Sequence, residues 1–422
     1  MGKKVTYLFG AGASANAIPV VADMHERMKE MSIFFKDFIK RSTAISESKE
    51  AGNLSILLQE YVVQLKHIND ELQWLIKEAG DYYSIDTLAK KFYLAGDSTE
   101  LIRLKKILII YFSLEQILLV PNDVKCEHSF KKSYIDKRYS NFIAGITKKS
   151  YPISASNIPR TDSFDFTLNP NISVLSWNYD MQFELTIQSL LTRTIISHVK
   201  ESFQIFPNQN SKAEVNFIAV NKEKFAMVKL NGDACFDYSS QQNYRLKRTV
   251  FDNRNLDDGN EMRLIHFLEN YNICSLKGKH DVNSDPCMAF NFAWECDDNF
   301  HGKYSGYRNN LALAEELAEQ TEVLVVIGYS FPVFNREIDK RIFDKMVNLQ
   351  KVYVQDVKSS AIVSTMRNAF QILQEREQLE ILKAKHTTKS EVTEIVEFSN
   401  EFKVEIVQVD NTNQFIIPYE LA

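Results

Sequence analysis

The sequence is poor in cysteine. Its 422 residues include five cysteines, and no two of them form a C-x-x-C pair. The five are Cys126, Cys235, Cys274, Cys287 and Cys296. A zinc ribbon and a thioredoxin-like redox motif both need closely spaced cysteine pairs, so the sequence indicates neither. We expect free thiols at all five positions and no bound metal.

Long apolar runs are also missing. No stretch approaches the roughly 20 apolar residues that a membrane-spanning helix requires. The opening residues, MGKKVTYLFG, place two lysines before one apolar run. That run is too short for a signal peptide, so we interpret it as the first core strand. The expected protein is cytoplasmic and has no membrane contact.

Positive charge is not in excess. The chain has 50 Lys and Arg against 55 Asp and Glu, which gives a net charge of -5. Such a chain has no general attraction to nucleic acid or to an anionic membrane, so direct nucleic-acid binding is not expected. The apolar share of 45% and the charged share of 25% are ordinary for a globular protein.

Strand-like and helix-like segments alternate along the chain. After the opening strand, compact apolar runs occur in ISVLSWNYD (172–180), FAMVKLNGD (225–233), EVLVVIGYS (322–330) and KVYVQDV (351–357). Segments with helical spacing lie between them, as in MQFELTIQSLL and NLALAEELAEQ. This alternation predicts an α/β fold built on a doubly wound parallel sheet.

A long helical segment interrupts this alternation. Residues from about 26 to 119 carry apolar side chains at three- and four-residue steps, which predicts a large helical insertion after the first strand and turn. We assign residues 1–377 to one domain that carries this insertion. Residues 378–422 form a C-terminal extension, which is either a capping element or a contact for an oligomer or partner.

Small and polar residues follow each predicted strand. These groups are Gly10–Ser14, Trp177–Asp180, Asn231–Asp233, Gly328–Ser330 and Asp356. Ligands of parallel α/β sheets bind outside the carboxyl ends of the strands, so we expect the five groups to face one crevice. Their small or polar character suits a nucleotide pocket.

The GAGAS turn, Gly10–Ser14, and the asparagine of SWNYD are the most informative of these groups. Backbone amides of the turn and the Ser14 hydroxyl would donate to a diphosphate at a helix start. A tight turn without a ligand is the alternative, because no third glycine completes G-x-G-x-x-G. The Asn178 amide can both donate and accept toward a ribose hydroxyl or a water. Asp180 also suits the cap of a following helix.

Taken in order, the blocks GAGASANAIP, SWNYD, KLNG, VVIGYSF and YVQD resemble the sirtuin family, and especially its bacterial NAD-hydrolysing branch in antiphage defence. The resemblance covers scattered blocks over roughly the first 360 residues. It implies a Rossmann-like fold with NAD as substrate. By motif position, it implies a pyrophosphate side formed by Gly10, Ala11, Gly12 and Ser14, a nicotinamide-ribose side formed by Asn178 and Asp180, and an adenosine side formed by Gly328, Ser330 and Asp356.

Three departures from the family pattern refine this expectation. The isolated cysteines cannot supply the family's four-cysteine zinc module, Val20 and Val21 stand where an arginine follows the Ile-Pro, and Asn231 replaces the general-base histidine. His198 and His266 are the alternative bases. Acyl transfer needs the base and a peptide groove beside the zinc module. Loss of a base costs hydrolysis only ~10²–10⁴-fold, so NAD hydrolysis is favoured over deacetylation.

With these departures, the resemblance implies an NAD glycohydrolase with Asn178, Asp180 and Asn231 as catalytic residues. By the same resemblance, it would release nicotinamide and ADP-ribose and act in antiviral defence by depleting NAD. The resemblance implies that it works as a homo-oligomer or with a separate protein, such as a HerA-type ATPase or an Argonaute-like module. Two alternatives stay open: a pseudoenzyme that binds NAD or an ADP-ribose-like signal without cleaving it, and a scaffold subunit of a defence complex.

Overall fold

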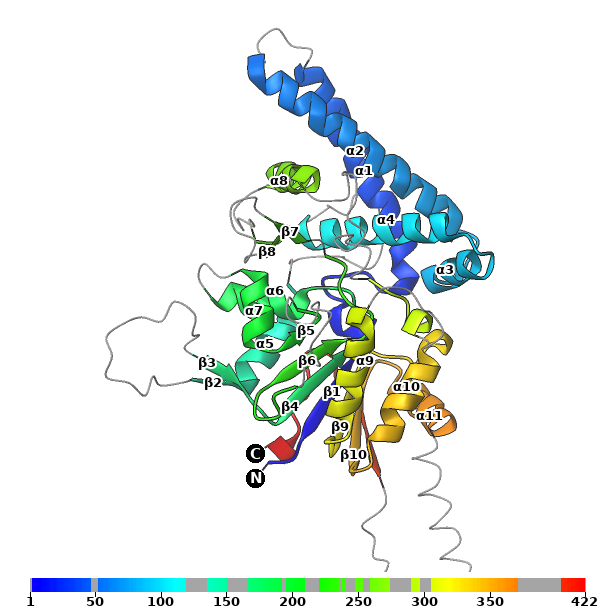
Figure 1. Cartoon of the computed structure of the whole chain (residues 1–422), viewed down its shortest axis with the longest axis vertical. Coiled ribbons are helices and arrows are strands. Elements are labelled where there is room, and N and C mark those ends of the chain that lie inside the picture. Colours follow the sequence, from blue (N-terminus) through cyan, green and yellow to red (C-terminus); the bar gives the residue numbers. More distant parts are fainter. Residues whose placement is uncertain are drawn as a thin grey trace, which may run out of the picture.

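The fold is described from a computed structural model of the chain (Figure 1). The structure describes residues 2–46, 52–118, 135–149, 166–191, 195–208, 220–235, 237–239, 247–252, 259–273, 290–296, 305–370 and 404–421.

A seven-stranded parallel sheet forms the centre of the molecule. Its strand order is β11-β10-β9-β1-β4-β6-β5, and every neighbouring pair is parallel. The strands are β1 (Val5–Phe9), β4 (Ile172–Ser176), β5 (Ile205–Phe206), β6 (Ala226–Lys229), β9 (Val323–Ile327), β10 (Lys351–Gln355) and β11 (Glu405–Val409). The prediction of a Rossmann-like α/β fold with a doubly wound parallel sheet is confirmed.

Helices cover both faces of this sheet because its strands are apolar on both sides. In β1, Tyr7 and Phe9 point into one buried cluster, whereas Leu8 points into the other. The first cluster includes residues of α5 (Lys137–Ile146), α6 (Gln182–Leu190) and α7 (Ile196–Ser202). The second includes residues of α9 (Ser305–Ala318), α10 (Arg336–Lys345) and α11 (Ser359–Ala369). Side chains that alternate along a strand thus reach two helical layers.

A third helical layer lies over the carboxyl edge of the sheet (Figure 1). It contains α1 (Val21–Ser46), α2 (Gly52–Ala79), α3 (Ile85–Leu94), α4 (Ser98–Ile117) and α8 (Asn260–Ile273). The predicted insertion is confirmed, and α8 joins it from a later part of the chain. Side-chain caps fix two helix starts: Ser84 accepts from the Thr87 amide, and Asp97 accepts from the Glu100 amide. Within the described ranges, no helix has the length and apolarity needed to cross a bilayer.

The segment after β1 differs from a strand, turn and α-helix in direct succession. A short 3-10 helix, Ala11–Ser14, follows the strand, and α1 begins only at Val21. Pro19 accounts for this delay, because proline disfavours helical backbone at the residue before it and fits the start of a helix.

Two short antiparallel pairs complete the described strands. They are β2 (Thr147–Lys149) with β3 (Phe166–Leu168), and β7 (Asp237–Ser239) with β8 (Lys247–Thr249).

The described part of the C-terminal extension belongs to the sheet. Strand β11 pairs with β10 at the sheet edge. Beyond it, the Phe415 ring lies 5.4 Å from the ring of Phe9 and 5.1 Å from that of Tyr139. The Gln355 side chain donates to the carbonyls of Asn411 and Gln414. These contacts make the segment a structural part of the domain.

Candidate functional site

Two of the predicted turns contact each other through their backbones. The Gly10 amide donates to the Ile327 carbonyl at 3.0 Å, and the Gly12 amide donates to the Gly328 carbonyl at 2.9 Å. A Cβ at position 12 would lie 2.7 Å from the Gly328 Cα, and Gly328 has a φ of +59°. The glycines are therefore needed for the two turns to pack. Ala11 is exposed, and its amide finds no acceptor within the described part of the chain.

Ser14, Asn178 and Asp180 form one hydrogen-bonded group. The Asn178 Nδ2 donates to the Ser14 Oγ at 3.3 Å. Hydrogen bonding by the nearby Ser14 hydroxyl lowers the pKa of Asp180. All three residues are buried. The structure thus brings together residues that the sequence places in different predicted turns, after β1 and after β4.

The Asp180 carboxylate also accepts from the first amide of α6, from the position before the N-cap residue Met181. Its Oδ1 accepts from the Gln182 amide at 3.0 Å. Burial raises the pKa of Asp180 above its ordinary value, and the ammonium of Lys229 offsets part of this rise.

Asn231 follows β6, the strand beside β4. Its Nδ2 lies 3.4 Å from the Trp177 carbonyl and 3.3 Å from the Tyr179 hydroxyl. The side chain is 4% exposed, and its Oδ1 has no hydrogen-bond partner among the described residues. A buried acceptor of this kind costs free energy unless a ligand or water satisfies it.

A compact charged cluster supports the end of β6. The Lys229 ammonium is fully buried, lies 3.2 Å from Glu184 and donates to the Asp180 carbonyl at 2.5 Å. Asp233 pairs with both Lys229 and Lys200. Burial acts to raise the pKa of Asp233, but the two ammonium groups outweigh it and lower the pKa to about 2. Asp233 therefore stays ionised near neutral pH.

Two more predicted site residues, Ser330 and Asp356, follow strands β9 and β10, which lie on the other side of β1 from β4 and β6. Ser330 is exposed after β9, and Asp356 follows β10. The Asp356 carboxylate accepts from the Lys358 amide at 2.7 Å. Strands lie ~4.8 Å apart, so the four steps from β6 to β10 span on the order of 19 Å. The site residues therefore follow an elongated line along one sheet edge.

Sequence reasoning missed the contribution of α5. The Tyr139 hydroxyl lies 3.0 Å from the Ser14 Oγ. The Arg138 Nη2 donates to the carbonyls of Gly12 and Ala13, at 3.1 Å each, and pairs with Asp136. No motif marks these residues. The available signals were only the Asp136 cap, which accepts from the Arg138 amide, and the apolar spacing of the helix.

The helical layer contacts the site from above. The Gln116 side chain of α4 accepts from the Met181 amide at 2.7 Å, and Ser113 donates to the Ala234 carbonyl at 3.3 Å. Of the two alternative bases, His266 lies on α8, 3.1 Å from Glu269, and His198 lies on α7. The structure gives no contact of either histidine with Asn231 within its described ranges.

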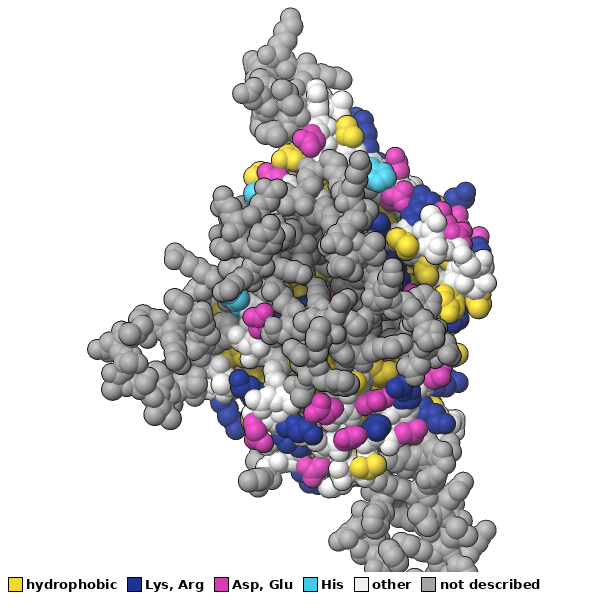
Figure 2. Space-filling model, viewed as in Figure 1, with side chains coloured by type: hydrophobic (Ala, Val, Ile, Leu, Met, Phe, Trp, Pro, Cys, Tyr) yellow, Lys and Arg dark blue, Asp and Glu magenta, His cyan; other side chains and the backbone are white. Residues whose placement is uncertain are grey.

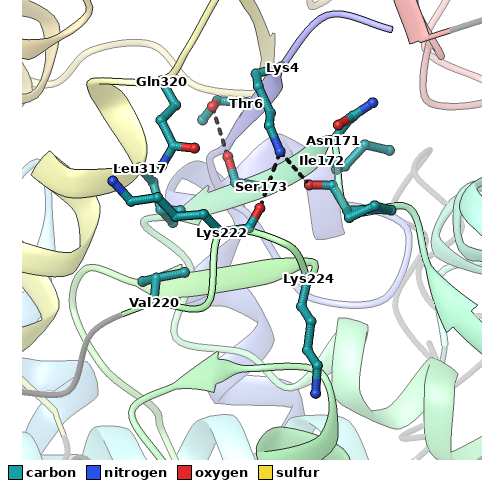
Figure 3. Close-up of a pocket in the computed structure, with 11 residues that line it drawn as sticks. Lys4, Thr6, Asn171, Ile172, Ser173, Val220, Lys222, Lys224, Leu317 and Gln320 are labelled. Carbon is teal, nitrogen blue, oxygen red and sulfur yellow. Dashed lines mark hydrogen bonds between the residues drawn. The ribbon is translucent and has the colours of Figure 1, made fainter. Parts of the chain in front are cut away.

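A small pocket lies at the opposite, amino edge of the sheet (Figure 3). There the Lys4 ammonium donates to the carbonyls of Pro170 and Lys222, and Thr6 and Ser173 share a hydrogen bond of 2.8 Å. Thr6 and Ser173 lie near the starts of β1 and β4, so this pocket is remote from the predicted crevice.

Two further observations concern metal and surface charge. The described residues contain no group of three His, Cys, Asp or Glu side chains placed to hold a metal ion. Cys235 is buried and forms no disulfide with a described residue. Where Figure 2 shows described residues over the sheet domain, acidic and basic side chains are interspersed.

Compared with known proteins, the chain matches no family model and no curated protein sequence.

Proposed function

We propose that the protein hydrolyses NAD at the bond between nicotinamide and ribose. The observation that carries the proposal is the Ser14–Asn178 hydrogen bond of 3.3 Å, which joins the β1 and β4 motifs at the carboxyl edge of the sheet. The elongated line of strand-end residues suits a ligand with two halves and a diphosphate between them. Ala11 is exposed, and its amide is the turn donor that we assign to that diphosphate.

The proposed reaction does not require acid catalysis by the protein. The C1′–N bond breaks, its electron pair neutralises the nicotinamide ring, and a ribosyl cation develops. Water adds its oxygen to C1′ and releases a proton, giving ADP-ribose and nicotinamide. Because the leaving group is already cationic in NAD, no general acid is needed. The protein must orient the ribose, stabilise the cation and position the water.

The site residues divide these tasks. Asn178 positions the attacking water or a ribose hydroxyl. Asp180, with Lys229 beside it, sets the charge below the ribose and holds Ser14. Asn231 presents its unpartnered Oδ1 to the ribose or to the water. Gly328, Ser330 and Asp356 face the adenosine half. We extend the proposal to antiviral NAD depletion by a cytoplasmic homo-oligomer or by a complex with a separate ATPase of the HerA type.

A second candidate is an NAD- or ADP-ribose-binding subunit without catalysis. Asn231 favours it, because an amide cannot accept a proton near neutral pH. Chromatography of NAD incubated with the purified protein, alone and with the protein encoded next to it, separates the two candidates. Nicotinamide release supports hydrolysis. Calorimetric NAD binding without release supports the binding subunit.

The Asn178→Ala variant tests the assigned site. It should reduce NAD consumption by about 100-fold or more, because it removes a group that acts in the chemical step. Its melting temperature should stay within a few degrees of wild type. Asn69→Ala is the control, since Asn69 is also buried and hydrogen-bonded, but to Ser32 within the helical layer. Equal turnover by Asn178→Ala and wild type would remove Asn178 from the mechanism.

A further inference from the structure

Helix α5 supplies a hydrogen bond to the centre of the candidate site. The Tyr139 hydroxyl lies 3.0 Å from the Ser14 Oγ, and both residues are buried. Arg138, the preceding residue, holds the carbonyls of Gly12 and Ala13 in the same turn. One helix outside all the recognised motifs therefore contacts both the backbone and the side chain of the glycine turn.

The Ser14 hydroxyl can donate one hydrogen bond and accept two. Hydrogen bonding by Ser14 lowers the pKa of Asp180, as a donor to the charged form of a carboxyl does, so Ser14 is the donor to Asp180. The Asn178 Nδ2 is a donor and takes one acceptor position of Ser14. The Tyr139 hydroxyl lies 3.0 Å from the same oxygen. We assign Tyr139 as the donor of this bond, because the Ser14 proton is directed at Asp180. Burial, and then the nearby Asp180 charge, raise the pKa of Tyr139 well above its ordinary value, so the phenol keeps its proton.

This arrangement determines which way the Asn178 amide faces. Its Nδ2 points toward Ser14, so its Oδ1 points away from the serine. If the Tyr139 donor were absent, the Ser14 oxygen could accept a different donor, and the Ser14 proton could leave Asp180. The amide of Asn178 would then lose its single orientation.

We propose that Tyr139 is a positioning residue, which orients the Asn178 amide through Ser14 for the reaction at the ribose. The inference rests on the proposed NAD hydrolysis and adds to it a residue from α5. Tyr139 does not contact substrate in this scheme.

The surroundings of Tyr139 allow a clean substitution. Its ring makes edge contacts with Phe9, Phe183 and Phe415, with centroid distances of 5.7, 6.4 and 5.1 Å. Tyr139→Phe keeps these contacts and removes only the hydroxyl. Tyr7→Phe is the matched control. Tyr7 is a fully buried tyrosine in β1 whose hydroxyl donates to the Ile416 carbonyl at 3.0 Å, away from Ser14.

The kinetic experiment measures kcat and KM for NAD in the active form of the protein. Tyr139→Phe should lower kcat by about 10-fold or more and leave KM within about 3-fold, as expected for an effect on the chemical step. Tyr7→Phe should leave both values unchanged. Ser14→Ala combined with Tyr139→Phe should be no slower than Ser14→Ala alone, because both act through one oxygen. A wild-type kcat in Tyr139→Phe, or effects that add in the double variant, would overturn the inference.

A crystallographic measurement tests the inference without turnover. High-resolution structures of wild type and Tyr7→Phe should contain one Asn178 conformer, with Nδ2 on Ser14. The Tyr139→Phe structure should contain a rotated or second conformer. An unchanged Asn178 in all three proteins refutes the positioning role even if the protein cleaves NAD. Conversely, a wild type that releases no nicotinamide refutes the proposed hydrolysis, and the conformers still decide the role of Tyr139.

Discussion

Asn231 has an acceptor oxygen that no described residue uses. If this amide positions a ribose hydroxyl or a water, Asn231→Ala should reduce NAD cleavage. Asn231→His should keep or raise it and add a pH dependence near ~6.5, because imidazole titrates there. Nicotinamide release measured from pH 5 to 9 checks both variants.

The two Asn231 variants also test the alternative function, an NAD-binding subunit without catalysis. In a binding subunit, wild type and both variants release no nicotinamide under any partner condition, and only the affinity for NAD changes. A wild type that is inert with its partner present, combined with cleavage by Asn231→His, would exclude hydrolysis and support binding alone.

Asp339 carries a prediction for the pH dependence of stability. This α10 carboxyl accepts from the Trp177 indole at 3.0 Å and from the Tyr329 hydroxyl at 2.6 Å. Burial raises the pKa of Asp339 to about 7, although both hydrogen bonds and the Arg336 charge oppose the rise. The folded state thus binds a proton that the unfolded state releases near pH 4. Stability from this group falls as pH rises from about 4 to 7, by up to about 1.4 kcal/mol per pH unit.

Asp339→Asn should remove this pH dependence. The amide can accept from Trp177 and does not titrate. We expect the free energy of unfolding of the variant minus that of wild type to be larger at pH 7.5 than at pH 5.5, because only wild type loses stability over this range. Urea unfolding at the two pH values measures the difference. A constant difference between variant and wild type would show that Asp339 is ionised throughout.

At the scale of elements, a buried ion pair joins α1 to α4 in the helical layer. The Arg27 guanidinium lies 2.9 Å from Glu115 and 2.7 Å from Glu30, and these side chains are almost fully buried. Removing Glu115 breaks this buried charged hydrogen bond while Glu30 still pairs with Arg27, so Glu115→Ala should destabilise the protein by about 1–3 kcal/mol. The triple variant Arg27→Met, Glu30→Gln, Glu115→Leu should recover most of this loss.

Denaturant unfolding measures these changes, with Lys29→Ala as the control on the same helix. Lys29 pairs with Glu26 at 3.0 Å, but both side chains are about half exposed, so its loss should cost under about 1 kcal/mol. Equal destabilisation by Glu115→Ala and Lys29→Ala would contradict a stabilising role for the buried pair.

Elements differ in how far the sequence predicts them. The sequence predicts strands β4, β6, β9 and β10, because each is an apolar run that ends in small or polar residues. The sequence does not predict helix α5, because a ten-residue helix between polar segments gives a weak periodic signal. The contribution of Tyr139 depends on a contact with Ser14 across the fold, which no local pattern encodes.

At the scale of the whole molecule, the parallel sheet follows from the alternation of strands and helices, but its order does not. Strand pairing joins segments far apart in sequence, so residue patterns alone do not place β1 between β4 and β9. The contact between Gly12 and Gly328 is one such pairing of segments far apart in sequence. The sequence predicts Gly328 on the adenosine side of the site, and only the structure identifies Gly12 as the group that approaches its backbone.

The central position of β1 has a consequence for synthesis. Val5 pairs with Ile172 on one side and with Val323 on the other. At ribosomal rates, β9 emerges on the order of tens of seconds after β1. Until then the glycine turn lacks the Gly328 carbonyl that fixes it, and one edge of β1 is unpaired. A nascent chain therefore cannot assemble the candidate site. An activity that consumes a shared metabolite would arise only after translation has passed the last strands of the core.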